Sequence, residues 1–326
     1  MPRNALLSWL VDPEPPGLGL DLRTGEMALV RLSEKRRTTE IDVCLDAPLP
    51  PGLVAFSMQS PNILDAEGLA KALNNMFLRA GASASKRVGL TLPDYVSRIT
   101  ILELPNPPSS SAELVAMLKF RLKKSIPFDV DQARVAFERL PGGERPRFLT
   151  GVMREDVVSQ YEDLLSGLGL HVGLVLPSTL SLLHLLGPVA RRDLSPDADY
   201  FFANFEHDYF SLSLVRADSL SLVRTLGLRA DSEPSAYGED DMLREIIPTA
   251  LYYREKLAGH RLERVYYRSL RPEVTRLREI LEEQFEVPTE PFHLLKAVKA
   301  GSELTVDAGL ADSVAAAAGG ALGRVA

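Results

Sequence analysis

The stretch GLGLDLRTGEMALVRL, from Gly17 to Leu32, predicts two strands joined by a tight turn. Apolar residues alternate with other residues in both halves, which is the pattern of a strand with one buried face. Thr24-Gly25 supplies the turn, because glycine accepts positive φ without strain. Asp21 lies near the end of the first strand, where an acid can serve either a binding site or local structure. The alternating apolar residues are Leu18, Leu20 and Leu22, then Met27 and Leu29.

The composition indicates a globular protein and argues against several classes of function. The 326 residues suffice for two domains or one large bilobal one, and 45% are hydrophobic. A net charge of −7 is unlike that of a dedicated nucleic-acid binder, so no nucleic-acid partner is expected. Cys44 is the only cysteine and the five histidines are scattered, so neither a disulfide framework nor a zinc site is expected.

The first 16 residues predict a separate N-terminal segment and linker. The apolar run from Ala5 to Val11 is shorter than the ~20 residues of a membrane helix. It also lacks the flanks of a signal peptide. Prolines at 13, 15 and 16 favour an extended linker into the first strand.

The block 17–93 predicts the order β-β-β-α-β. A third strand fits Glu40 to Leu45, and a helix fits Asp65 to Arg79, with Asp65 as its N-cap and Gly81 as its stop. The segment KRVGLTLP, from Lys86 to Pro93, predicts the next strand.

A smaller α/β unit is expected over residues 94–176. A strand from Val96 to Leu104 precedes a helix from Ser111, the expected cap, to Lys124. A turn with the sequence PGGERP joins two further strands, and a helix from Glu155 and a strand from His171 complete the unit. An apolar helix over 177–198 is then expected to return to the first lobe.

A second lobe is expected over 199–300, followed by a small-residue helix over 301–326. The lobe opens with three strands, at 200–206, 209–216 and 219–226. A long helix from Asp241, a short strand at 264–267 and a helix from Pro272 to Phe285 follow. The first lobe, the inserted unit and the second lobe predict a bilobal α/β protein.

Several segments in this order resemble the PilM family, the actin-like cytoplasmic proteins of type IV pilus assembly. The opening hairpin is similar, and the most specific match is LKFRLKKSIPFDVDQARVAFE, from Leu118 to Glu138. The cytoplasmic domains of type II secretion L-type proteins and the FtsA division proteins are more distant relatives. The resemblance implies a duplicated ribonuclease H-like fold with a small inserted subdomain in the first lobe. Further matching segments are Val88–Pro105, 175–186 and Leu243–Ser269.

The segments that would hold a nucleotide in this fold depart from the family pattern. The first loop keeps Asp21 but has Arg23 where the family has glycine, before Thr24 and Gly25. Asn204 replaces the acid of the second loop, and bulky residues follow it. Glycines let a backbone approach phosphates closely, and acids hold Mg²⁺ through water. The third, normally glycine-rich loop reads RSLRP and contains Ser269.

These departures predict a protein that binds no cofactor or metal and catalyses nothing. Only the residues from Gly227 to Asp240 stand where the family inserts a lid subdomain, so the lid is expected to be reduced or missing. Weak residual binding of ATP and Mg²⁺ stays open. The fold also leaves two different functions open, namely an ATP-binding enzyme of the actin and sugar-kinase superfold and an FtsA-like adaptor of division or secretion.

By resemblance, the expected function is a cytoplasmic scaffold at the inner membrane. Its expected partner is the cytoplasmic tail of a PilN-type inner-membrane protein, and the pilus motor ATPase is a further candidate. The tail would lie in a groove between the first and inserted subdomains and add main-chain hydrogen bonds. The expected lining residues are Val88, Leu90, Leu92, Leu114, Leu118, Ile126 and Phe128, of which Ile126 and Phe128 equally suit an ordinary core.

Two charged clusters have more than one interpretation. Glu206-His207-Asp208 suggests acid–base chemistry, but consecutive residues in a turn point different ways, which favours a solvated turn. Lys119, Arg121, Lys123 and Lys124 make one helix end basic. Such a cluster is usually solvated, and it can also meet an acidic partner or lipid headgroups.

Overall fold

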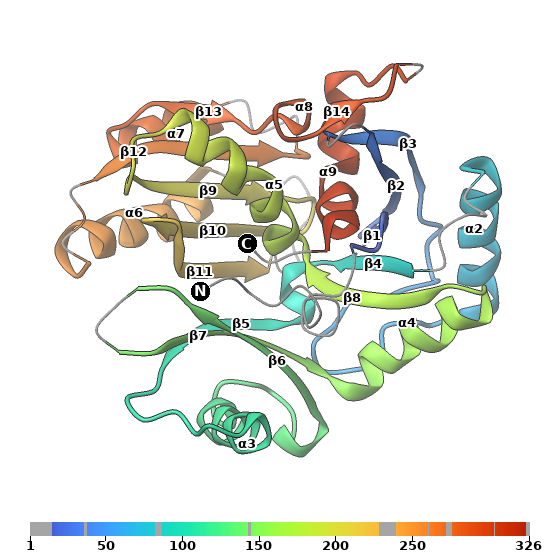
Figure 1. Cartoon of the computed structure of the whole chain (residues 1–326), viewed down its shortest axis with the longest axis horizontal. Coiled ribbons are helices and arrows are strands. Elements are labelled where there is room, and N and C mark those ends of the chain that lie inside the picture. Colours follow the sequence, from blue (N-terminus) through green and yellow to red (C-terminus); the bar gives the residue numbers. More distant parts are fainter. Residues whose placement is uncertain are drawn as a thin grey trace.

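The computed structural model describes residues 15–35, 38–81, 87–142, 145–227, 239–257, 259, 261–271, 276–302 and 304–323. Three sheets organise this part of the chain (Figure 1). A six-stranded sheet forms the first lobe, a five-stranded sheet forms the second, and a three-stranded sheet forms an inserted unit. The expected N-terminal segment lies outside the described residues except for its last two.

The first sheet grows from the opening hairpin. β1 (Leu18–Arg23) and β2 (Glu26–Lys35) pair antiparallel around Thr24-Gly25, and Gly25 has the expected positive φ of 76°. β3 (Thr38–Pro48) pairs with β2, and β4 (Arg87–Leu92) pairs parallel with β1. The predicted β-β-β-α-β order of this block is therefore confirmed. The sheet order is β14-β3-β2-β1-β4-β8, with β8 at His171–Pro177 and β14 at Lys299–Ala300.

Helices cover both faces of this sheet (Figure 1). α2 (Ala66–Arg79) and α4 (Glu155–Gly167) pack on the face that carries Leu20, Leu29 and Leu90. The Asp65 carboxylate caps α2 by accepting a hydrogen bond from the Gly68 N–H, as expected. α5 (Ser178–Asp193) and α9 (Ala308–Leu322) bury the opposite face against the second lobe.

The second lobe is a sheet with the order β11-β10-β9-β12-β13. Alternate residues of β9 (Asp199–Phe205) face the two sides: Phe202 faces α5 and α9, and Phe201 faces α6 and α7. This alternation explains why every residue of β9 is buried. The remaining elements are β10 (Tyr209–Arg216), β11 (Ser219–Gly227), α6 (Glu239–Glu255), β12 (Leu262–Ser269), α7 (Leu277–Phe285), β13 (Thr289–Pro291) and α8 (Leu294–Ala297).

The inserted unit is smaller than the sequence indicates. Its sheet has the order β5-β7-β6, with α3 (Ser111–Leu122) on one face. β8 was expected to belong to this unit, but it pairs with β4 and joins the first sheet. Ser111 begins α3 instead of capping it, and Ser110 at the cap position makes no side-chain cap bond. The strands are β5 (Arg98–Glu103), β6 (Ala133–Leu140) and β7 (Arg147–Arg154), with short turns η1 (Asp94–Val96) and η2 (Val130–Gln132).

α9 lies in contact with the first sheet and the α5 helix at the centre of the molecule (Figure 1). An added Cβ at Gly19 would lie 1.8 Å from the Ala317 carbonyl oxygen, and one at Gly89 would lie 2.1 Å from that of Gly320. Only glycine fits these two strand positions. The small-residue pattern thus places the last helix directly on the first strands.

Two further expectations concern the chain between elements. The reduced lid was expected at Gly227 to Asp240, and residues 228–238 of it lie outside the described residues. Of the helices that the structure describes, none is long and apolar enough to cross a membrane.

Candidate functional site

The β1–β2 hairpin places Arg23 in the space between the lobes. Its side chain is 3% exposed, and its guanidinium donates five hydrogen bonds, matching its five N–H groups. They go to Asp21 at 2.5 Å, to Glu26, and to Ser313 of α9. Arg23 therefore holds the hairpin to the C-terminal helix and neutralises the buried Asp21.

A second buried arginine serves the other lobe. Arg268, on β12, donates to Glu206 at 2.5 Å, to the Asn204 side-chain oxygen at 2.9 Å and to the Asp312 carbonyl at 2.8 Å. Glu206 is 2% exposed, so the expectation that it lies in a solvated turn is wrong for this residue. The Glu206 carboxylate follows β9 and faces Arg268 in the interior. His207 and Asp208, which come next in the turn, are only half-buried.

The charges set the protonation of this network. Burial raises the pKa of Asp21 to about 6, although the charge of Arg23 opposes that shift. Burial works in the same direction on Glu206, but the Arg268 and Arg23 charges outweigh it and lower the pKa of that carboxyl. Glu206 is thus held ionised between two guanidinium groups.

Further hydrogen bonds continue the network into α5 and the inserted unit. The Asn204 amide donates to the Thr179 hydroxyl at 3.0 Å, and the Thr179 N–H donates to Asp94 at 2.9 Å. Ser211 of β10 donates to the other oxygen of Asp94 at 2.5 Å. Burial raises the pKa of Asp94 to about 6, against these hydrogen bonds. Both lobes therefore share one continuous set of buried polar contacts.

The turns of the two hairpins also meet at the rim of the site. The Thr24 hydroxyl and the Tyr95 hydroxyl both donate to the Asp208 carboxylate, the latter at 2.6 Å. The His207 imidazole lies 3.7 Å from the Glu26 carboxylate, and this contact raises the pKa of the imidazole and helps lower that of Glu26 to about 2. We call these contacts, between Thr24, Tyr95, Asp208, Glu26 and His207, the rim clasp.

These residues do not fit a nucleotide with its metal ion. The acids and loops that would face phosphates instead bind Arg23 and Arg268, whose guanidinium groups lie buried between them. Among the described residues, the network leaves one Glu206 oxygen and one Arg268 nitrogen without a partner, which suits a water molecule better than a triphosphate. No group of three or more potential metal ligands occurs in the described part of the chain.

Comparison with known proteins rests on structure alone. No protein-family model matches the chain, and no curated protein matches it. A chain of a solved PilM–PilN type IV pilus biogenesis complex matches with a TM-score of 0.78 and 19% identity, over 95% of this chain and 98% of that one.

The chain has an actin-like, PilM-like fold. A Bacteroides thetaiotaomicron protein described as having an actin-like ATPase fold matches with a TM-score of 0.53 and 11% identity. The cytoplasmic domain of EpsL, an inner-membrane component of the Vibrio cholerae type II secretion system, matches with a TM-score of 0.50 and 15% identity. Each match covers 86% of this chain and 91% of the other.

Within this PilM-like fold, the expected nucleotide residues have different positions. Asp21, Arg23 and Asn204 belong to the buried network, and Thr24 belongs to the rim clasp. Gly25 forms the turn apex, with open space around its α-carbon. Ser269 lies apart from them, because its hydroxyl bonds the backbone of Arg271 within its own turn.

Some members of the network have no local signal in the sequence. Arg268 was expected in the third loop, but its pairing with Glu206, 62 residues away in the chain, was not. Arginine is common at the ends of strands, so its presence there does not indicate a particular partner. Ser313 gave no signal at all, because its partner lies 290 residues away. Asp94 was also missed, although a carboxylate after the strand-ending LTLP segment was a possible signal.

The residues expected to line a partner groove are mostly core residues. Val88, Leu90 and Leu92 are at most 1% exposed and pack under α2 and α4. Leu114, Leu118 and Ile126 fill the core of the inserted unit, and Phe128 packs partly buried against it. This placement corrects the expectation for the six buried residues, since buried side chains offer no surface to a partner.

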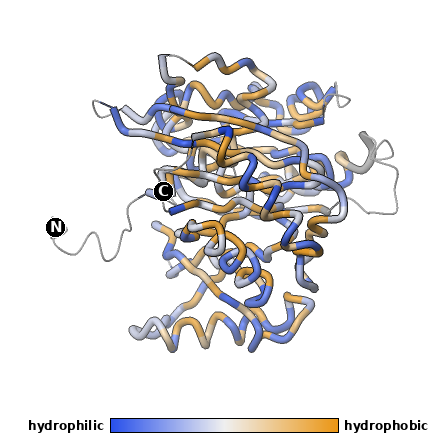
Figure 2. The backbone as a smooth tube through the Cα atoms, turned by 90° about the vertical axis from the view of Figure 1, so that its right-hand side faces the viewer, coloured by the Kyte–Doolittle hydropathy of each residue, from blue (hydrophilic) through white to orange (hydrophobic). Residues whose placement is uncertain are grey.

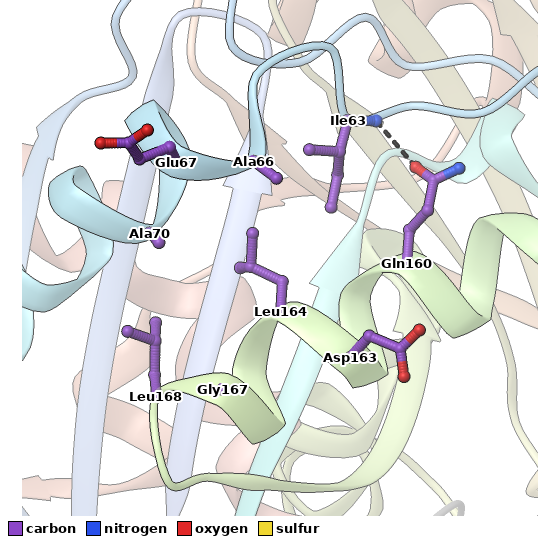
Figure 3. Close-up of a pocket in the computed structure, with 9 residues that line it drawn as sticks. All are labelled: Ile63, Ala66, Glu67, Ala70, Gln160, Asp163, Leu164, Gly167 and Leu168. Atoms are coloured by element: carbon purple, nitrogen blue, oxygen red, sulfur yellow. Dashed lines mark hydrogen bonds between the residues drawn. The ribbon is translucent and has the colours of Figure 1, made fainter.

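A groove between α2 and α4 does offer such a surface (Figure 3). It has a volume of about 550 Å³. Ile63, Leu164 and Leu168 point into it, and Ala66, Ala70 and Gly167 leave room for a ligand side chain. Glu67 and Asp163 add negative charge beside it. Gln160 supports one end by accepting hydrogen bonds from the N–H groups of Asn62 and Ile63. We call this the α2–α4 groove.

Proposed function

We propose that the protein is a non-catalytic scaffold of a type IV pilus or related secretion assembly platform. On this proposal it binds the cytoplasmic tail of a PilN-type inner-membrane protein and is peripheral to that membrane through its partner. The similarity to a chain of a PilM–PilN complex and to the EpsL cytoplasmic domain supports the assembly role.

The observation that carries the non-catalytic part is the pair of buried arginines. Arg23 is paired with Asp21, the acid that an actin-like nucleotide site would need for its metal ion, and Arg268 is paired with Glu206, two residues after Asn204 in the second loop. Separating these pairs to admit a nucleotide would leave buried charges uncompensated, which costs several kcal/mol. ATP binding would therefore have to overcome the contacts that join the two lobes.

The α2–α4 groove is the surface that we propose for the tail. Its apolar floor would take alternate apolar side chains of a short peptide, and its two acids favour a peptide with a basic residue. Small residues at 66, 70 and 167 would let the peptide backbone approach both helices. The partner's position would thus be on the face of the first sheet opposite α9.

Titration calorimetry tests this proposal with a synthetic peptide that carries the cytoplasmic tail of a PilN-type protein from the same organism. We expect micromolar affinity for the wild-type protein and strongly reduced affinity for Ala70→Phe, which fills the groove. The matched control is Ala112→Phe, an exposed alanine in the first turn of α3. Absence of binding by a well-folded wild-type sample would contradict the partner assignment. Equal binding by both variants would contradict the groove assignment.

The competing function, an ATP-binding enzyme of the same fold, is tested by calorimetry with Mg-ATP. We expect no binding and no phosphate release at millimolar nucleotide. Stoichiometric binding with turnover would replace the scaffold proposal by the enzyme function. Peptide binding and nucleotide binding are separate measurements, so each part of the proposal can fail alone.

A further inference from the structure

The tip of α3 combines an exposed aromatic ring with unpaired positive charge. Phe120 is 77% exposed, more than any other large apolar side chain in the described part of the chain. Lys123, the C-cap residue of α3, and Lys124, in the turn that follows the helix, come three and four residues after Phe120. Lys119 and Arg121 flank it in the chain. We call these five residues the α3 tip.

The cations of the α3 tip form no ion pair with a described residue, although the chain carries a net charge of −7. The charge of Lys119 helps to lower the pKa of Glu155, but that acid is itself paired with Arg134. The acids nearest in sequence are Glu113, in the first turn of the helix, and Asp129, which caps the η2 turn. The positive charges of the α3 tip are thus available to an anionic ligand outside the chain, although the protein as a whole is acidic.

The α3 tip also lies where another surface can reach it. α3 covers the outer face of the inserted unit, at the end of the molecule away from the second lobe (Figure 1). The hydropathy view shows the same end of the backbone as a mixture of apolar and hydrophilic segments (Figure 2). One face of α3 packs on its sheet through Leu114, Leu118 and Leu122. Phe120 lies outside that buried face, so its ring is exposed.

We propose that the α3 tip binds the surface of an anionic lipid membrane. Long cationic side chains without fixed partners suit lipid headgroups, which are mobile and carry negative charge. A ring that projects by itself between such cations can enter the boundary between headgroups and acyl chains. An acidic protein partner would instead need a pocket on its own surface to receive the Phe120 ring, because the α3 tip presents the ring and no pocket. The inference is independent of the partner proposed above, because it concerns a different surface.

Vesicle co-sedimentation of the full chain tests this proposal. The probes are vesicles of phosphatidylcholine alone and vesicles that also contain phosphatidylglycerol. We expect binding only to the anionic vesicles, weakened as the salt concentration rises. Lys123→Gln/Lys124→Gln should weaken the binding about ten-fold, and Phe120→Ser should weaken it several-fold.

Matched controls come from α2. Lys71→Gln/Arg79→Gln removes the same amount of charge from another exposed helix, and Leu78→Ser removes a side chain that is 71% exposed. These variants should bind anionic vesicles like the wild type. Failure of the wild type to bind, or equal losses in the α2 controls, would overturn the proposal. Unchanged binding by the α3 variants would overturn it as well, and would assign lipid binding elsewhere in the chain.

A second arm separates the lipid from an acidic protein partner. Soluble poly-glutamate is added to the protein in place of vesicles, and binding is followed by calorimetry. Tight binding to poly-glutamate that depends on Phe120, without binding to anionic vesicles, would assign the α3 tip to an acidic protein segment instead.

Discussion

Arg23 and Ser313 are 290 residues apart in the sequence, yet the Arg23 guanidinium donates to both the hydroxyl of Ser313, at 2.6 Å, and its carbonyl, at 2.9 Å. This contact joins the opening hairpin to the last helix of the described chain. Since Arg268 donates to the neighbouring Asp312 carbonyl, α9 receives one arginine from each lobe. The relative position of the two lobes therefore depends on a few buried polar contacts.

The first prediction concerns the Arg23–Asp21 pair. Arg23→Ala should lower the free energy of unfolding by about 3 kcal/mol, because it leaves the Asp21 carboxylate buried without its partner. Chemical denaturation measures the change. Lys71→Ala, which breaks an exposed pair with Glu67, should cost less than about 1 kcal/mol.

A double variant separates the charge from the packing at this site. Asp21→Leu/Arg23→Met removes both charges and should recover most of the lost stability. If it were as unstable as Arg23→Ala, the network would act through its hydrogen bonds to α9 and not through charge compensation.

The second prediction concerns the contact between Gly19 and α9. Gly19→Ala should destabilise the protein by about 3 kcal/mol, because the added methyl group would overlap the Ala317 carbonyl. Gly167→Ala is the matched control, since nothing lies within 4 Å of its added Cβ. The control should leave the thermal unfolding midpoint unchanged or slightly raised. A tolerated Gly19→Ala would contradict the close approach of α9 to β1.

The third prediction is a pH dependence of the rim clasp. The contact with the Glu26 carboxylate raises the folded-state pKa of His207 above its unfolded value of 6.5. The stabilisation is therefore fully present below pH 6.5 and is lost as the pH rises through the folded-state pKa. The stability difference between wild type and His207→Gln should shrink accordingly between mildly acidic and alkaline pH.

Urea unfolding over this pH range measures the difference. A constant difference for His207→Gln would show that the imidazole charge does not stabilise the clasp.

The fourth prediction concerns nucleotide and the folded state. Millimolar Mg-ATP should leave the thermal unfolding midpoint of the wild type unchanged, whereas a ligand at a hundred times its dissociation constant adds about 2.7 kcal/mol of stability. Differential scanning fluorimetry detects such a change. A clear upward shift that Arg268→Ala abolishes would contradict the closed site described above.

Much of the fold could be predicted because its signals are local. The alternation of Leu18, Leu20 and Leu22, the Thr24-Gly25 turn and the Asp65 cap each depend on a few neighbouring residues, and the structure confirms them. The sheet to which a strand belongs depends on strands that are distant in the sequence. β8 has the same apolar pattern whether it pairs with β4 or with the inserted sheet, so its assignment to the inserted unit was wrong.

The candidate site shows the same limit. The sequence shows at Arg23 and Asn204 that a glycine and an acid of the family pattern are absent. It does not show which residues these two side chains contact in the folded protein. Glu206 looked like a turn residue because its partner, Arg268, is on a strand that follows much later in the chain. Likewise, Leu90 and Leu114 looked available for a partner, since apolar residues carry no local sign of which core they fill.

The position of α9 has a consequence for how the protein is made. Gly19 and Gly89 of the first strands closely approach a helix that the ribosome synthesises after all the other described elements. Until that helix emerges, the face of the sheet formed by Ala28, Val30 and Ile41 lacks one of the two helices that bury it. The nascent chain must therefore hold an incompletely covered first lobe in solution until α9 emerges, and synthesis interrupted before that point would release it with part of this apolar face open to aggregation.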